Sequence, residues 1–493
     1  NNLYKKLTGK SKQKYPERIL QYGEGNFLRG FVDWMIDLLN EKGLFQGSVV
    51  LVQPIGAGQC TLINEQDGLY TLILRGIEGG KVVQDKRIIS SVSRGLSPYA
   101  DYDAYMACAA NPDLRFIVSN TTEAGIAWQD GCKADDKPPA SFPAKVTQFL
   151  KRRYDAFKGD PHKGLVLIPC ELIDRNGDNL KALVLRHAEE WQLGADFIKW
   201  VKESNHFLNT LVDRIVTGFP KDELATIQAE LGYEDQALDT AEPFHAWVIE
   251  GDAKFEEELP FRQAGLDVIW TADMTPYRTR KVRILNGAHT MTTLAAYIAG
   301  LDTVRDFMED PELSAFMKKG LFEEIIPTLD LPKADLDSFA SAVTERFANP
   351  FIKHLLLSIS LNSTSKFKVR CLPSLLAYRE RKGQLPPALC FALAAQMVFY
   401  RGTEIRDGAL IGSRNGAEYR ISDDLPILEV YRELWKSWNG TPEGSATLVR
   451  AVLGRSDFWG EDLNQLKGLT DLVSGHMHAI ATGGLRAALG RIK

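Results

Sequence analysis

The chain has 493 residues, 44% of them hydrophobic and 25% charged, which is enough for two domains with separate cores. Its formal net charge of -5 gives no electrostatic reason to expect nucleic acid or an anionic membrane as a partner. No apolar run approaches the roughly 18 residues of a membrane-spanning helix, the N-terminal stretch lacks the apolar segment of a signal peptide, and the six cysteines are scattered like reduced thiols, so we expect a cytoplasmic protein.

Short β-rich runs alternate with helical stretches in the first half of the chain. The segment 27–43 has apolar residues at helical spacing and predicts one amphipathic helix that ends at Gly43. Because strands alternate with helices, we predict an α/β fold with a parallel, doubly wound sheet. The predicted strands lie within 18–27, 48–56, 114–126 and 164–177, with a hairpin insertion at 69–76 and 81–93.

Helical patterns dominate the second half of the chain. No strand alternation stands out there, and the composition shifts near 275–285. We therefore predict an α/β domain over residues 1–279 and a mainly α-helical domain over residues 280–493. The helical patterns cover 284–300, 334–348, 350–362, 386–401 and 424–439.

The stretch "YGEGNFLRG" follows the first predicted strand and opens a helix, as a dinucleotide-binding turn requires. Gly23 and Gly25, followed by Asn26 and Phe27, would let the backbone approach a pyrophosphate at the helix N-terminus. Leu28 stands where the third glycine of GxGxxG would be. A glycine-rich turn without a ligand therefore remains an alternative.

Two later strand ends supply further cofactor candidates. Gln53 stands where an acidic residue normally holds the adenosine ribose; it can hydrogen-bond a hydroxyl but would not repel a 2′-phosphate, so charge alone leaves NAD and NADP both open. Asn120, Thr122 and Glu123 lie in the polar run "SNTTE" after a later strand, at the edge where open α/β sheets bind ligands. A turn capped by Asn and Ser side chains would have the same composition.

The segment "KVRILNGAHT", residues 281–290, predicts an apolar helix that nevertheless carries a lysine, an asparagine and a histidine. At about 100° per residue, Asn286 lies about 140° and His289 about 80° from Lys281, so the three fan across one side. Lys281 could reach the surface, pair with a buried acid, or be a desolvated proton donor. Asn286 could polarise a carbonyl oxygen, and His289 could hold a substrate hydroxyl or bond a backbone carbonyl in the core.

The stretches "YGEGNFLRGF", "LVDRIVTGFP" and "KVRILNGAHT" together resemble the mannitol dehydrogenase family of polyol-specific long-chain dehydrogenases. The similarity runs from about Tyr15 to the C-terminus, and "NEQDGLYT" and "IPCELIDRNG" are most similar to members that reduce keto-hexuronates. The resemblance implies a Rossmann-type N-terminal domain, a mainly helical C-terminal domain, NAD(H) as cofactor, no metal, and hydride transfer to a keto group.

The same resemblance implies roles for single residues. Lys281 would be the catalytic acid/base, Asn286 the group that polarises the carbonyl, and His289 a substrate ligand. Asp213, in "VDRI", falls on a further site position of the family.

Two positions depart from the sugar-alcohol members of the family. Leu172 stands where they carry an asparagine, so one half of their oxyanion pair is missing, and Glu171 or a neighbouring loop residue would have to compensate. Arg278 stands where they carry an acidic residue, three positions before Lys281. An added positive charge would suit a substrate that carries a carboxylate.

A basic pair further along the chain supports an anionic substrate. Lys366 and Arg370 are four apart in "LNSTSKFKVRCLP", so a helix would put them on one face. An arginine forms a two-pronged pair with a carboxylate, and a lysine adds a point charge. A solvated basic face that includes Lys368 is the alternative; the resemblance, in which this stretch matches a segment that closes over substrate, favours binding.

We therefore expect an NAD-dependent oxidoreductase that acts on a small hexuronate, with Lys281 as general acid/base. The same chemistry on another keto-uronate or on a polyol such as mannitol is the nearest alternative, because the catalytic face would be unchanged. A nucleotide-binding regulator without turnover is an alternative of another class, and the presence of a proton donor argues against it.

Overall fold

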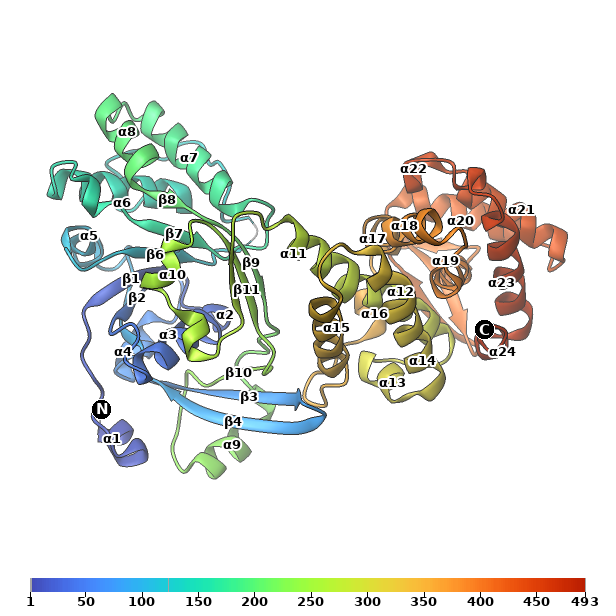
Figure 1. Ribbon diagram of the computed structural model, residues 1–493, viewed down its shortest axis with the longest axis horizontal. Coiled ribbons are helices and arrows are strands. Elements are labelled where there is room, and N and C mark those ends of the chain that lie inside the picture. Colours follow the sequence, from blue (N-terminus) through green and yellow to red (C-terminus); the bar gives the residue numbers. More distant parts are fainter. Residues whose placement is uncertain (1, 123, 493) are drawn as a thin grey trace. The chain divides into compact units, whose positions relative to one another are not determined.

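The computed structural model describes residues 2–122 and 124–492, whose contacts divide the chain into two compact units (Figure 1). The N-terminal unit ends at Met274 and leaves out the short segment Ile77–Lys81. That segment groups with the C-terminal unit, which begins at Thr275. The composition of the chain predicts this boundary between residues 279 and 280.

The N-terminal unit is built on a six-stranded sheet in which all neighbouring strands are parallel. The strand order is β5-β2-β1-β6-β7-β8. Numbered along the chain, this is the 3-2-1-4-5-6 order of a Rossmann sheet, which reverses between β1 and β6. The predicted doubly wound α/β fold is confirmed. The strands are β1 (Glu17–Tyr22), β2 (Ser48–Val52), β5 (Val92–Leu96), β6 (Phe116–Ser119), β7 (Val166–Pro169) and β8 (His206–Phe207).

Both faces of this sheet are buried, which explains the unbroken apolar runs of its strands. Successive residues of β1 point to opposite sides, so Ile19 joins one core cluster and Leu20 joins the other. The first cluster contains α3 (Val32–Glu41), and the second contains α6 (Phe142–Ala156) and α7 (Asn176–Glu190). Figure 1 shows α6 and α7 on the same side of the sheet.

The single helix predicted over 27–43 is wrong in one respect, because the chain bends at Gly30. The bend separates α2 (Asn26–Arg29) from α3. A Cβ atom at Gly30 would lie 3.0 Å from Asp239 Oδ2, so the backbone passes close to a buried carboxyl group at this point.

The predicted hairpin insertion is present as β3 (Tyr70–Glu78) and β4 (Lys81–Ile89), neighbours in a three-stranded sheet. Gly79 and Gly80 form its turn, and their φ angles of 59° and 76° suit a two-residue hairpin turn with two left-handed positions. Other strands of the small sheets are β10 (Asp239–Ala241), β9 (Asn209–Asp213), β11 (Ala246–Glu250) and β12 (Val268–Thr271).

The C-terminal unit is mainly α-helical, as predicted. Within 2–122 and 124–492, no helix is long and apolar enough to cross a membrane. The helices are α11 (Thr275–Arg280), α12 (Gly287–Ile298), α13 (Val304–Glu309), α14 (Pro311–Lys319), α15 (Lys333–Phe347), α16 (Leu356–Ile359), α17 (Ser363–Arg370), α18 (Leu372–Lys382), α19 (Pro387–Phe399), α20 (Leu425–Ser437), α21 (Pro442–Leu453), α22 (Ser456–Trp459), α23 (Leu469–Gly483) and α24 (Leu485–Leu489).

Two expectations for this half of the chain were wrong. The helix predicted over 350–362 is reduced to the short α16. A small antiparallel sheet also occurs where no strand was expected. One of its turns, Asn415-Gly416, has φ angles of 52° and 81°, so the Asn-Gly hairpin signal was present in the sequence. The strands are β13 (Ile405–Arg406), β14 (Ala409–Arg414) and β15 (Ala417–Ile421).

Candidate active site

The turn after β1 and the loop after β6 meet at the carboxyl edge of the main sheet, where the strand order reverses. Gly23 N–H donates to Val52 O at 2.9 Å. Asn120 N–H donates to Tyr22 O at 3.0 Å. Gly23 has a φ of 126°, and a Cβ atom there would lie 2.9 Å from Asn120 O. Glycine is therefore needed at this position for the two segments to come so close.

Gly25 differs from Gly23, because its side-chain position faces open space. A Cβ atom at Gly25 would have no neighbour within 4 Å, and the residue has an ordinary φ of -70°. The packing of the protein itself therefore does not require a glycine here. A ligand lying against this backbone would require one, as a pyrophosphate does at the first turn of a Rossmann sheet.

Replacing Gly25 by alanine is expected to weaken NADH binding by about tenfold, or roughly 1.4 kcal/mol, because the new methyl group would meet the ligand. The thermal midpoint of unfolding should stay unchanged, because the methyl group would not meet the protein. Differential scanning fluorimetry and an NADH fluorescence titration measure the two quantities. Gly475→Ala is the matched control, since a Cβ atom there also has no neighbour within 4 Å and the residue lies on α23. Equal NADH affinity in both variants would show that no ligand lies against Gly25.

Asn26 and Phe27 turn their side chains toward the protein. Asn26 Oδ1 accepts a hydrogen bond from Arg29 Nη2 at 2.8 Å, and Phe27 stacks on Phe31 with ring centroids 5.1 Å apart. Arg29 is buried, and its Nε also donates to Glu24 O at 2.9 Å. The two predicted cofactor residues would thus act through their backbone. Arg29, which the sequence did not single out, holds the turn in shape.

Gln53 is buried just after β2, and its side-chain amide is used within the following loop. Its Nε2 donates to Ile55 O and to Gly56 O, each at 3.0 Å. A contact with a ribose hydroxyl would therefore fall to Oε1, as an acceptor. The loop that follows, "PIGAGQ", contains no lysine or arginine.

A buried carboxyl group organises the loop after β6. Glu171 accepts hydrogen bonds from Ser119 Oγ, Thr121 N–H and Thr121 Oγ1, each at 3.1 Å, and burial raises its pKa. Thr122 follows with a φ of 80°, which is costly for a β-branched residue. Such strain concentrates at ligand sites, where the surrounding structure imposes it. The candidate Glu123 lies outside the described residues.

The segment after β7 contains Leu172, which stands in the place of an asparagine that could donate a hydrogen bond. Leu172 is 60% exposed, whereas Asn176 is fully buried. Asn176 Nδ2 donates to Pro169 O and Glu171 O, and its Oδ1 accepts from Gly177 N–H. The side chains of Glu171 and Asn176 are thus both engaged in hydrogen bonds within the loop.

Asp213 is the last residue of β9 and is only 9% exposed. The next residue, Arg214, is buried, donates from Nη1 to Gly30 O at 2.7 Å, and lies over the ring of Trp34 at 4.1 Å. These contacts fix the "VDRI" segment against the chain between α2 and α3.

The chain between α11 and α12 is a π-helical turn, Lys281–Asn286, and not the α-helix assumed from the sequence. Its backbone hydrogen bonds join residues five apart, as in the bond from Gly287 N–H to Val282 O. Residues five apart therefore lie closer together around the helix axis than in an α-helix, where Lys281 and Asn286 would be about 140° apart. This turn, called the π-turn below, brings the candidate proton donor and the candidate carbonyl ligand nearer to one another on their side of the helix.

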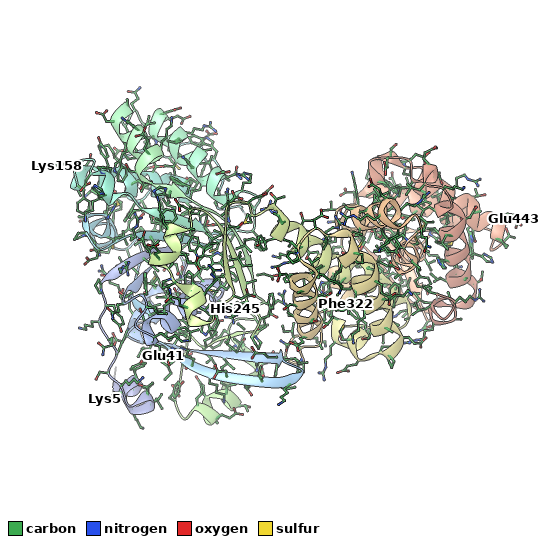
Figure 2. All side chains as sticks on the ribbon, in the orientation of Figure 1. Lys5, Glu41, Lys158, His245, Phe322 and Glu443 are labelled. Carbon is green, nitrogen blue, oxygen red and sulfur yellow. The ribbon has the colours of Figure 1, made fainter. Side chains whose placement is uncertain are left out.

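Arg283 braces the π-turn against the rest of its unit. Its Nε donates to Ser374 Oγ at 2.6 Å and its Nη2 donates to Thr328 Oγ1 at 2.8 Å, and both hydroxyl residues are buried. Thr328 in turn donates to the backbone of a second π-helical turn, Gly320–Ile325, which carries Phe322, labelled in Figure 2. No local spacing in the sequence marks either of these turns.

His289 follows the π-turn on α12. Its ring stacks on Phe347 with centroids 4.4 Å apart and planes at 10°, and its Nε2 is buried without a hydrogen-bond partner among the described residues. Burial, followed by a group of nearby bases, lowers the pKa of His289 to about 3, so the ring is neutral at physiological pH. Its Nε2 therefore has unused hydrogen-bonding capacity. The nearby bases are His354, Arg346, Arg370 and Lys366.

Lys366 and Arg370 lie on α17, in agreement with the predicted helical spacing. Lys366 Nζ donates to Ile359 O at 2.7 Å, and Arg370 Nη1 donates to Thr290 Oγ1 at 3.3 Å. Burial lowers the pKa of both groups, whereas Lys368 between them is exposed. The pair is half-buried and Arg370 contacts α12, which argues against a solvated basic face.

The structure therefore assembles two groups of candidates in the C-terminal unit. The first group is Lys281 and Asn286, which lie at the two ends of the π-turn. The second group is His289 with Lys366 and Arg370, which the packing of α17 on α12 brings near one another. This packing is close, since a Cβ atom at Gly287 would lie 3.1 Å from Arg370 O. Arg278 lies on another element, α11, where burial lowers its pKa.

Two family models match the chain over most of its length. The mannitol dehydrogenase Rossmann domain matches residues 17–262. The mannitol dehydrogenase C-terminal domain matches residues 273–481. Altronate oxidoreductases of Klebsiella pneumoniae (strain 342) and Escherichia coli (strain HS) are each 50% identical to the chain over 477 residues, which is 97% of this chain and 97% of theirs.

Two solved structures have a similar fold over nearly the whole chain. A D-sorbitol dehydrogenase in substrate-free form has a TM-score of 0.78 at 22% identity, and the match covers 96% of this chain and 95% of that one. A mannitol 2-dehydrogenase of Pseudomonas fluorescens, in a ternary complex with NAD and D-mannitol, has a TM-score of 0.64 at 21% identity, with 98% and 95% covered.

Proposed function

The chain belongs to the mannitol dehydrogenase family, and on that premise we propose that it is an NAD-dependent enzyme which interconverts D-tagaturonate and D-altronate. The 50% identity to altronate oxidoreductases over 97% of the chain carries this proposal. The half-buried pair Lys366 and Arg370 supports it independently, because a sugar acid carries a carboxylate that such a pair would bind. A cytoplasmic location is part of the proposal, supported by six cysteines that are all free.

The carboxyl edge of the main sheet fits a bound dinucleotide. Gly23 allows the segments after β1 and β6 to meet, and Gly25 leaves open the space that a pyrophosphate would occupy. Gln53, Asn120 and Thr122 border the same edge and are the proposed ribose and nicotinamide contacts. Bound NADH would supply the hydride that adds to the ketone carbon of the substrate.

The π-turn would supply the proton chemistry. During reduction the ketone oxygen gains negative charge, and the Asn286 amide would donate a hydrogen bond to that oxygen. Lys281 would donate the proton that completes the alcohol, and in the reverse direction it would take that proton back. His289 would bind a neighbouring substrate hydroxyl through its neutral ring.

The substrate carboxylate is assigned first to Arg370, whose planar guanidinium can hold it with two parallel hydrogen bonds. Lys366 would add a second positive charge from the same helix. Arg278 and Asp213 are further proposed substrate-binding residues, the first for its added charge beside Lys281 and the second for its position in the family motif.

Rates of NADH oxidation with D-tagaturonate, D-fructuronate and D-fructose test the substrate assignment. We expect the highest kcat/KM with D-tagaturonate, and a lower one with the neutral ketose, because the basic pair would lose its carboxylate partner. A higher kcat/KM with D-fructuronate or D-fructose would overturn the assignment and leave the family chemistry in place.

NADH is expected to be preferred to NADPH by about tenfold or more in kcat/KM, the scale of one charge-assisted hydrogen bond. The segment "QPIGAGQ" from Gln53 onward offers no lysine or arginine to pair with a 2′-phosphate. Steady-state kinetics with the two cofactors at saturating D-tagaturonate measure the preference. Equal or better efficiency with NADPH would show that the ribose site lies elsewhere.

A further inference from the structure

Two imidazole rings lie side by side in the C-terminal unit, and the mechanism above uses only one of them. The rings of His289 and His354 have centroids 5.2 Å apart and planes at 68°. Phe347 stacks on His289 and fixes the plane of that ring. His354 lies just before α16, and its carbonyl accepts a hydrogen bond from Val304 N–H at 3.0 Å, which fixes its backbone.

The charged groups that act on this pair are bases. Lys366 and Arg370 act on His289 from α17, and Arg346 acts on it from α15. Burial is the first cause, His354 the second and these three bases the next in lowering the pKa of His289 to about 3. Burial and then Lys366 lower the pKa of His354.

An acid that raises the pKa of Lys366 is already engaged in hydrogen bonds. Asp423 is the acid that acts on Lys366. Its carboxylate accepts hydrogen bonds from the hydroxyl group of Tyr400 and from the backbone N–H of Thr364 at the start of α17. Two helices, α15 and α17, therefore bring basic groups to the two rings, and this positive charge suits an anion.

We propose that His354 is a substrate-binding residue that takes up a proton from solvent when the carboxylate of the sugar acid binds beside Lys366 and Arg370. The inference rests on the proposed hexuronate substrate and deepens it. A carboxylate close to an imidazole favours the charged ring, which can then donate a charge-assisted hydrogen bond to it. His354 is the ring that takes the proton, because His289 is deeper among the bases and its pKa is held at about 3.

Proton linkage gives the direction of the pH dependence. Burial holds the pKa of His354 below the ordinary value of about 6.5 in the absence of the anion, and the bound carboxylate raises it. Binding therefore takes up a proton between these two values, and affinity for the anion rises as the pH falls through that window, by at most about tenfold per pH unit. A neutral polyol brings no charge, so its affinity does not depend on this group.

Calorimetry of D-altronate binding to the protein with NADH counts the protons directly, since this dead-end complex cannot react. Titrations at about pH 6, near the ordinary pKa of histidine, in two buffers of different ionisation enthalpy should show proton uptake in the wild type. His354→Gln and His354→Asn should reduce it to near zero. The matched control is His476→Gln, a half-buried histidine on α23 whose pKa burial also lowers, and it should retain the uptake.

Each outcome of this experiment has a clear meaning. Undiminished proton uptake in folded His354→Gln or His354→Asn, judged by their melting temperatures, would overturn the inference, and so would altronate binding to the wild type without uptake. D-altritol, a neutral polyol, should bind without uptake if it binds. If D-altronate does not bind and D-tagaturonate does not react, the result contradicts the proposed substrate and not the role of His354.

A second measurement uses the wild type alone and does not depend on the variants folding. The KM for D-tagaturonate should fall as the pH is lowered from about 8 to about 6, through the window defined by the linkage. The KM for a neutral ketose should not follow it. A KM for D-tagaturonate that stays constant or rises over this range would overturn the role of His354.

Discussion

Replacement of Lys281 by alanine is expected to lower the turnover of D-tagaturonate by roughly a hundredfold or more, the usual effect of removing a general acid/base. The π-turn places Lys281 near Asn286, so in this variant the carbonyl ligand would remain without the proton donor beside it. NADH binding should persist, because the proposed cofactor residues all belong to the N-terminal unit. Steady-state kinetics and an NADH fluorescence titration measure the two effects.

Two further variants make this experiment specific. Lys281→Arg keeps the positive charge but cannot release a proton near neutral pH, so it should be about as inactive as the alanine variant. Lys319→Ala is the control, because it removes another half-buried lysine of the same unit, whose Nζ lies 3.5 Å from Glu323 Oε2. This variant should keep wild-type turnover. Near wild-type turnover by Lys281→Ala across neutral pH would remove Lys281 from the mechanism.

Replacement of Arg370 by alanine should lower kcat/KM for D-tagaturonate by roughly ten- to a hundredfold, since a charge-assisted hydrogen bond contributes about 1.5–3 kcal/mol. The kcat/KM for a neutral ketose such as D-fructose, if that is turned over, should change little, because only the uronate carries the carboxylate. Kinetics on both substrate types measure the difference.

Other basic residues provide the comparison for Arg370. Lys366→Ala should show a smaller loss of the same kind, and Arg278→Ala a smaller one again. Lys368→Ala is the matched control, because Lys368 lies on the same helix and is exposed. If Arg370→Ala, Lys366→Ala and Arg278→Ala all keep full efficiency on D-tagaturonate, the carboxylate is bound elsewhere.

The main sheet could be predicted from the sequence because its strands carry a strong local signal. The runs around Ile19 and Val50 are apolar on both faces, as strands covered on both sides must be. The break at Gly30 was less visible, since the close contact of this residue with the carboxyl group of Asp239 arises only in the folded chain. The β14–β15 hairpin had a usable signal in Asn415-Gly416, which the dominance of helical patterns around it obscured.

The candidate site was predictable by residue type and not by geometry. Lys281, Asn286 and His289 stand out as polar residues in an apolar segment, but the angles between them assumed an α-helix. The π-turn depends on contacts from Arg283 to residues far along the chain, which no local spacing reveals. His354 was missed for the same reason, because only the folded chain brings it to His289.

The central claim, hydride transfer between NADH and the ketone of D-tagaturonate, is tested most directly by isotope labelling. The protein is incubated with D-tagaturonate and NADH that carries two deuterium atoms at C4 of the nicotinamide ring, and the product is examined by NMR. D-altronate with a single deuterium on the carbon that was the ketone should form in an amount equal to the NADH oxidised. Absence of D-altronate, or D-altronate without the label at that carbon, would contradict it.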